Sequence, residues 1–253
     1  MNTNVLPPLA SAPSRADRTT PRLFYIGIAA LLAIIIFLAF ARTYWIPLAD
    51  GSSSVHSAIH VHAVLYFAWT ALFFTQAVLA ARGHIALHQR LGLFGIALAG
   101  AMVLSGLLAA VVTMNGALGT PREPIVRANT ALSLGAMLMF STFIGLAVAN
   151  LARPERHKRY IVLAMFSILQ AAIARIIMLV PSIGHPLRTL LGAIFVDVLL
   201  LIVIALDARK HGRIHPVYVG GLVFLLIVQI VRRAVLNTPQ WIEFTNWMAG
   251  LAG

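Results

Sequence analysis

Long apolar runs alternate with short polar segments along most of the chain. Each run holds about 20 residues, the length that an α-helix needs to cross the hydrocarbon core of a bilayer. Proline and glycine punctuate the segments between the runs, as at Pro121, Pro154 and Pro216, and these residues favour turns. The pattern predicts an all-α fold, a polytopic transmembrane helix bundle with seven spans. The expected spans are approximately 23–41, 61–81, 91–113, 129–151, 160–180, 187–206 and 217–231.

The segments that flank these runs suggest three parts of the chain. Residues 1–22 are polar and rich in Pro, Ser, Thr and Arg, so we expect a disordered cytoplasmic arm. Residues 23–236 are expected to form the seven-helix transmembrane domain, with short connections that make consecutive helices antiparallel neighbours. Residues 237–253 include three aromatic side chains typical of a membrane interface, which predicts an outer interfacial tail. The first run, at about 19 residues, is longer than a signal-peptide core, which favours an uncleaved anchor; cleavage would leave six helices.

Composition supports a lipid environment. Hydrophobic residues make up 60% of the 253 residues and charged residues only 10%, with a mean hydropathy of +0.90. A soluble domain carries about 25% charged residues, because its surface faces water. Most of this surface is therefore expected to contact the lipid bilayer. The chain has no cysteine, which excludes disulfides, thiolate metal sites and iron–sulfur clusters.

The net charge of +12 is distributed in short clusters between the apolar runs. A basic protein can bind nucleic acid, but this distribution is the one that places Lys and Arg beside anionic lipid on the cytoplasmic side. We therefore expect no nucleic-acid partner, a bacterial inner (cytoplasmic) membrane location, the N-terminus inside and the C-terminus outside. Twelve of the 19 Lys and Arg residues then lie on the cytoplasmic side: Arg15, Arg18, Arg22, Arg82, Arg90, Arg153, Arg156, Lys158, Arg159, Arg209, Lys210 and Arg213.

Two ionisable residues fall well inside predicted spans, Arg175 in the fifth and Asp197 in the sixth. A charge at the centre of a bilayer costs about 2.5–3.5 kcal/mol on insertion scales, so such residues are usually paired or functional. A short Pro-containing turn joins the two spans, which predicts a buried ion pair between Arg175 and Asp197. Such a pair either fixes the register of the helices or belongs to a path for a proton or small anion.

Histidines are the second group that could carry chemistry, because imidazole ligates haem iron, copper and zinc. His88 and His157 open two helices that enter from the same side, so they can meet at one depth. His84 lies four residues before His88, and the three residues together form a candidate metal site. On the outer side, His62, with or without His185, marks a second polar site. The alternative is that histidines at helix ends only face headgroups or cap backbone carbonyls.

Several functions have no sequence support. The only lysines, Lys158 and Lys210, lie in predicted cytoplasmic loops, so no membrane-buried lysine is present to hold retinal as a Schiff base. The chain also has no Walker loop, no dinucleotide-binding glycine fingerprint and no His-Glu-x-x-His motif. The catalytic residues, if the protein is an enzyme, cannot be assigned from these patterns.

A series of short motifs over about residues 56–180 resembles a known family. In order, these are His62-Ala-Val-Leu, Gln76, Leu87-His88-Gln89-Arg90-Leu91-Gly92, His157-Lys-Arg159-Tyr160 and Ala174-Arg175. They resemble the bacterial membrane family catalogued as domain of unknown function 2306. The family has no assigned reaction, and the resemblance marks His62, His88, His157 and Arg175 as candidate cofactor-binding residues. In outline, the chain is also similar to b-type cytochrome membrane subunits, in which histidines on helices hold haem near one membrane face.

The sequence thus leaves three functional hypotheses. The first is a histidine-dependent, redox-type membrane protein that binds haem b or a divalent metal. The second is a proton or small-anion transporter that uses Arg175 and Asp197. The third is a structural or assembly subunit that associates with other membrane subunits.

Overall fold

The computed structural model describes residues 15–252, with side chains from Leu23 onwards. All the secondary-structure elements in this part of the chain are helices, with no β-strand among them. The elements are α1 (Arg15–Ala39), η1 (Ala41–Trp45), α2 (Ile46–Ala49), α3 (Ser57–Arg82), α4 (Ile85–Asn115), α5 (Glu123–Ala149), α6 (Pro154–Ile177), α7 (His185–His211), α8 (Pro216–Val235) and α9 (Pro239–Gly250).

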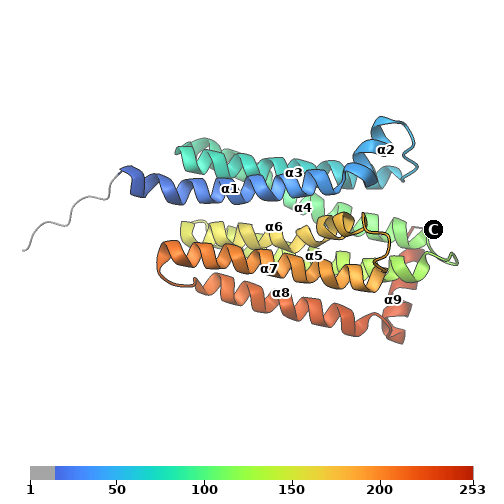
Figure 1. Ribbon diagram of the computed structural model, residues 1–253. Coiled ribbons are helices and arrows are strands. Elements are labelled where there is room, and N and C mark those ends of the chain that lie inside the picture. The colour runs from blue at the N-terminus through green and yellow to red at the C-terminus, as the bar shows by residue number, and fades with distance from the viewer. Residues whose placement is uncertain (1–14, 253) are drawn as a thin grey trace, which may run out of the picture.

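The long helices run alternately up and down in one elongated bundle, as the short connections predict (Figure 1). Six of them, α3 to α8, are long and apolar enough to cross a bilayer. The first apolar run is interrupted at Phe40, where η1 and α2 continue the helix at an angle of 43°. Counting this bent pair as one span gives up to seven. The predicted all-α, multi-pass architecture is therefore confirmed, and seven is the upper limit of the number of spans.

The two ends of the bundle differ in composition. One end holds the α3–α4, α5–α6 and α7–α8 connections, and we call it the basic end because most of the Lys and Arg residues lie there. The opposite end, the α9 end, holds α2, the α4–α5 and α6–α7 connections, and α9, which lies across the bundle axis (Figure 1).

Helix α6 is the central element. It packs against α1, α5, α7 and α8, and Leu163, Ala164, Met165 and Leu169 are completely inaccessible. The indole Nε1 of Trp69 on α3 lies 3.1 Å from the sulfur of Met165. In a lipid environment the outer surface of a bundle is as apolar as its interior. The interior is therefore recognised by burial, which is greatest on α6.

The structure describes part of the expected arm and nearly all of the expected tail. Residues 1–14 of the predicted arm lie outside the described residues, and α1 begins at Arg15, within that segment. The predicted tail forms α9, and Arg127 on α5 holds it: Nη1 donates to the Ile242 carbonyl at 2.9 Å and Nη2 to Asn246 Oδ1 at 2.8 Å. The aromatic residues that predicted an interfacial tail therefore belong to a helix, α9, which packs against the bundle.

Candidate functional site: a histidine pair at the basic end

Local turn geometry places His88 at the basic end of α4. Gly83 ends α3 with φ +78°, a backbone conformation that favours glycine, and α4 begins two residues later. The side-chain amide of Gln76 on α3 donates to the backbone carbonyl of His88 at 3.0 Å. This hydrogen bond ties the first turn of α4 to the last turns of α3, so the position of His88 relative to α3 is fixed.

His157 occupies the first turn of α6, next to the end of α5. Its Nδ1 lies 2.9 Å from the carbonyl oxygen of Ala147. Because a carbonyl only accepts hydrogen bonds, Nδ1 carries the hydrogen, and the lone pair of the neutral ring is on Nε2. Metal-ligating histidines commonly donate their other ring N–H to a backbone carbonyl, which fixes the orientation of the imidazole.

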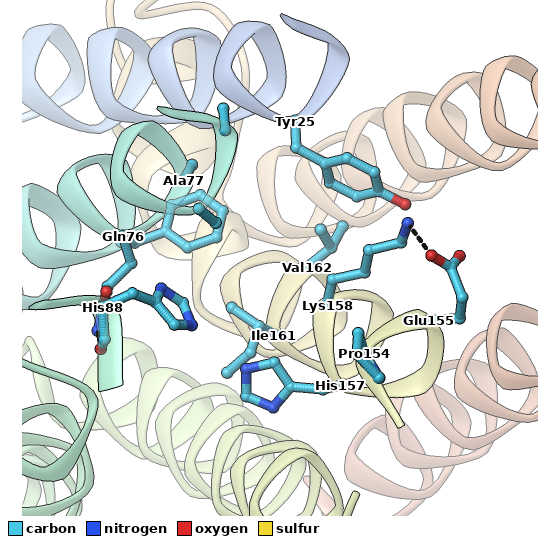
Figure 2. Close-up of a pocket in the computed structure, with 13 residues that line it drawn as sticks. Tyr25, Gln76, Ala77, His88, Pro154, Glu155, His157, Lys158, Ile161 and Val162 are labelled. Atoms are coloured by element: carbon cyan, nitrogen blue, oxygen red, sulfur yellow. Dashed lines mark hydrogen bonds and ion pairs between the residues drawn. The ribbon is translucent and has the colours of Figure 1, made fainter. Parts of the chain in front are cut away.

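The two imidazoles lie close together, with ring centroids 6.5 Å apart and ring planes at 86°. They face the same space from α4 and α6 (Figure 2). A cavity of about 510 Å³ opens beside them, and α1, α3, α4 and α6 line it. Its wall is mainly apolar, with Phe73, Ala77, Ile161 and Val162 among the lining residues. This volume is within the range of about 300–1,000 Å³ that small-molecule and cofactor sites occupy.

Two polar atoms at this site are buried and lack a hydrogen-bond partner within the described part of the chain. They are Nδ1 of His88 and Oε1 of Gln76. Buried polar atoms are nearly always hydrogen-bonded, so orphaned ones in a cavity wall indicate a missing ligand or water.

The rim of the cavity is charged. Lys158 Nζ donates to Glu155 at 2.7 Å and also lies 4.8 Å from the centre of the Tyr25 ring (Figure 2). An apolar interior beneath a charged rim suits an amphipathic, planar cofactor better than a hydrated ion.

The predicted three-histidine metal site is wrong for the described residues. No group of three or more His, Asp or Glu side chains in residues 23–252 lies close enough to hold one metal ion. His84 precedes the first turn of α4, where its side chain is exposed and makes no capping hydrogen bond. A separation of four residues puts two side chains on one face only if both belong to the helix, and α4 starts at Ile85.

The predicted ion pair between Arg175 and Asp197 is also wrong. Arg175 Nη1 donates to the Ala171 carbonyl at 2.9 Å, and the guanidinium lies 4.2 Å from the centre of the Phe40 ring. Asp197 instead accepts a hydrogen bond of 2.9 Å from Gln229 on α8. Helices α6 and α7 are neighbours, but Arg175 contacts Phe40, just after the end of α1, while Asp197 contacts Gln229 on α8. This removes the observation on which the transporter hypothesis depended.

His62 lies in the half of the bundle nearer the α9 end, away from the His88–His157 pair. Its ring stacks on Tyr66, with centroids 4.1 Å apart, and interacts with the backbone of Ser105 on α4. Arg175 and His62 interact electrostatically. His185 instead contacts Asn129, with Nε2 3.0 Å from Oδ1. His62 and Arg175 are therefore grouped, but they do not join the cavity of the other two histidines.

Other histidines have local structural roles. His56 and His215 each accept a hydrogen bond from the backbone N–H two residues later, at the start of α3 and α8. The alternative interpretation of helix-end histidines as caps is correct for these two, although they cap backbone N–H groups rather than carbonyls.

A buried ionic cluster lies at the basic end, where the sequence patterns predict none. Asp207 on α7 accepts from Arg159 Nη2 at 2.7 Å and from the hydroxyl of Tyr25 at 2.8 Å. Sequence position places Arg159 among the basic residues of the cytoplasmic side and gives no sign of its burial. The one available signal was the spacing of Glu155 and Arg159, four apart, which form an ion pair of 2.7 Å on α6.

No family model, no curated protein and no solved structure matches the chain. The fold and site define a multi-pass helical membrane protein with an internal cavity, and the resemblance to the family of unknown function remains a prediction.

Proposed function

We propose that this multi-pass protein binds haem b between His88 and His157 and takes part in electron transfer at the membrane. The observation that carries the proposal is the facing histidine pair in the wall of a cofactor-sized cavity. The ring centroids of His88 and His157 are 6.5 Å apart, a spacing at which both imidazoles could reach one ion through bonds of about 2 Å each.

Each residue of the site would have a defined task. The Ala147 carbonyl holds His157 with Nε2 as the free ligand atom, and Gln76 fixes the backbone of His88. The apolar wall, including Phe73 and Val162, would exclude water, and the Lys158–Glu155 ion pair forms the polar rim. A haem held by His88 and His157 would supply reversible one-electron chemistry.

We further propose that the basic end faces the cytoplasm of a bacterial cell. The support is the excess of Lys and Arg at this end, which matches the charge bias of cytoplasmic loops. The histidine pair would then lie near the inner face of the membrane.

An absorption spectrum of the purified protein tests the haem proposal. We expect a Soret band and a shift on reduction with dithionite in the natural protein. His88→Ala and His157→Ala should each lose the low-spin spectrum, whereas His84→Ala, which changes an exposed histidine in the same turn region, should keep it. A colourless protein that does not take up added haemin, or unchanged spectra in both site variants, would reject the proposal.

A further inference from the structure

A second cavity, of about 590 Å³, lies at the basic end on the other side of α6. Helices α5, α6 and α8 and the α7–α8 connection line it. It shares no lining residue with the histidine cavity. The two cavities are therefore separate sites.

The mouth of this second cavity is basic and its cations are uncompensated. Arg156 and Arg213 line it, both exposed, and neither side chain makes a hydrogen bond or ion pair within residues 23–252. Tyr160 adds a hydroxyl and His215 an imidazole. Burial lowers the pKa of His215, and the charges of Arg159 and Arg156 act in the same direction. The positive charge at the mouth therefore comes from the two lining arginines, Arg156 and Arg213.

The inner part of the cavity is mainly apolar and lies between the candidate membrane spans α5, α6 and α8. It reaches along α8 from Pro216 to Phe224, a rise of about 12 Å. Phe143 and Phe224 close it, with ring centroids 5.7 Å apart. Gly220 lies in the wall, and a side chain added there would meet no atom within 4 Å. The absence of a side chain at Gly220 therefore leaves room along the helix surface.

We propose that this cavity is a binding site for an anionic phospholipid. A phosphodiester would lie between Arg156 and Arg213, and the first part of an acyl chain would follow the groove past Gly220 towards Phe143 and Phe224. Basic pockets between spans on the cytoplasmic side favour anionic headgroups, because the guanidinium fork matches phosphate oxygens.

A lipid fits better than a free anion because the site combines two chemistries. A free phosphate would use only the basic mouth and leave the apolar groove below it unfilled. Arginines at the mouth and an apolar groove below it together suit an amphipathic ligand.

Native mass spectrometry of the full-length, delipidated protein in detergent can measure the binding. The probes are phosphatidylglycerol and phosphatidylcholine with the same palmitoyl and oleoyl chains, and inorganic phosphate as the chain-free competitor. We expect one tightly bound phosphatidylglycerol, weaker binding of phosphatidylcholine, and no displacement by millimolar phosphate.

Matched variants separate the two parts of the site. The double variant Arg156→Gln/Arg213→Gln should weaken phosphatidylglycerol binding about tenfold or more, while Arg153→Gln/Arg209→Gln, two exposed arginines at the same end outside the cavity, should not. Gly220→Leu should block the groove, whereas Gly100→Leu, also in open space but on α4, should bind normally.

Three results would overturn the proposal. The first is equal affinity for the two phospholipids. The second is an equal loss of binding in both arginine double variants, which would indicate a diffuse charge effect. The third is full competition by inorganic phosphate together with normal binding to Gly220→Leu, which would indicate an anion site without a lipid chain.

Discussion

Arg159 and Asp207 form an ion pair from which solvent is almost completely excluded. Arg159 Nη2 and Asp207 Oδ2 are 2.7 Å apart, and the two side chains are 1% and 0% exposed. Both Nε and Nη2 of the guanidinium donate to the same carboxylate oxygen, and Tyr25 donates to the other. The cluster joins α1, α6 and α7 at the basic end, so it fixes how these three helices pack.

Replacing Arg159 should therefore be costly. Arg159→Met leaves Asp207 buried without its cation, and breaking a buried pair in this way costs about 3–5 kcal/mol. We expect a large fall in the midpoint of thermal unfolding, measured in dodecyl maltoside by circular dichroism. In the double variant Arg159→Met/Asp207→Leu, which removes both charges, much of the loss should be recovered.

Arg175→Met provides the contrasting case, because Arg175 has no carboxylate partner among the described residues. Its contact with Phe40 contributes about 0.5–2 kcal/mol, less than the roughly 2.5–3.5 kcal/mol that an unpaired charge costs in a span. The variant should be as stable as the natural protein or more stable. An unfolding midpoint as low as that of Arg159→Met would show that Arg175 has a counterion or ligand.

These two arginines also show what the sequence can and cannot predict. The apolar runs locate the helices, because each spanning helix must be long enough to cross the hydrocarbon core of the bilayer. The helices extend past the predicted spans, as α4 does at both ends of 91–113, since backbone hydrogen bonding continues into the polar interface. Hydropathy says nothing about rotation around a helix axis. That rotation decides that Arg175 meets Phe40 instead of Asp197.

The histidine pair was predictable only in part: its depth was, but its orienting contacts were not. The shared entry side of the two helices predicts a common depth for His88 and His157, and the structure brings their rings together. The contacts that orient them, from Gln76 and the Ala147 carbonyl, depend on the turns at the basic end and have no sequence signal. Burial of Arg159 was missed because a basic residue near a helix end normally lies at the headgroup level.

The α6–α8 contact depends on the absence of a side chain at Gly221. A Cβ at this position would collide with the Cδ atoms of Leu163, a residue that is itself fully buried. Gly221→Ala should destabilise the protein by about 1–3 kcal/mol through overpacking. Gly220→Ala, one residue away in open space, is the control and should keep the natural unfolding midpoint. Equal midpoints for the two variants would contradict this account of the contact.

Attachment of α9 should depend on Arg127. Its guanidinium bonds to Ile242, Thr245 and Asn246, and a hydrogen bond to a charged group contributes about 1.5–3 kcal/mol. In Arg127→Ala, hydrogen–deuterium exchange over residues 239–250 should accelerate at least about tenfold while α6 stays protected. Arg122→Ala removes an exposed arginine five residues earlier and should leave α9 unchanged. Slow exchange in both variants would mean that apolar packing alone holds this helix.

Orientation in the membrane can be measured directly, because the natural chain contains no cysteine. Single cysteines at exposed positions mark the two ends: Ser54→Cys precedes α3 at the α9 end, and Ala152→Cys lies in the α5–α6 connection at the basic end. Lys and Arg are retained on the cytoplasmic side during insertion, so the basic end should be inside. In spheroplasts, a membrane-impermeant maleimide should label Ser54→Cys at once and Ala152→Cys only after permeabilisation. The reverse pattern would place the basic end outside. The histidine pair and the phospholipid cavity would then face the outer leaflet, and the positive-inside argument would fail for this chain.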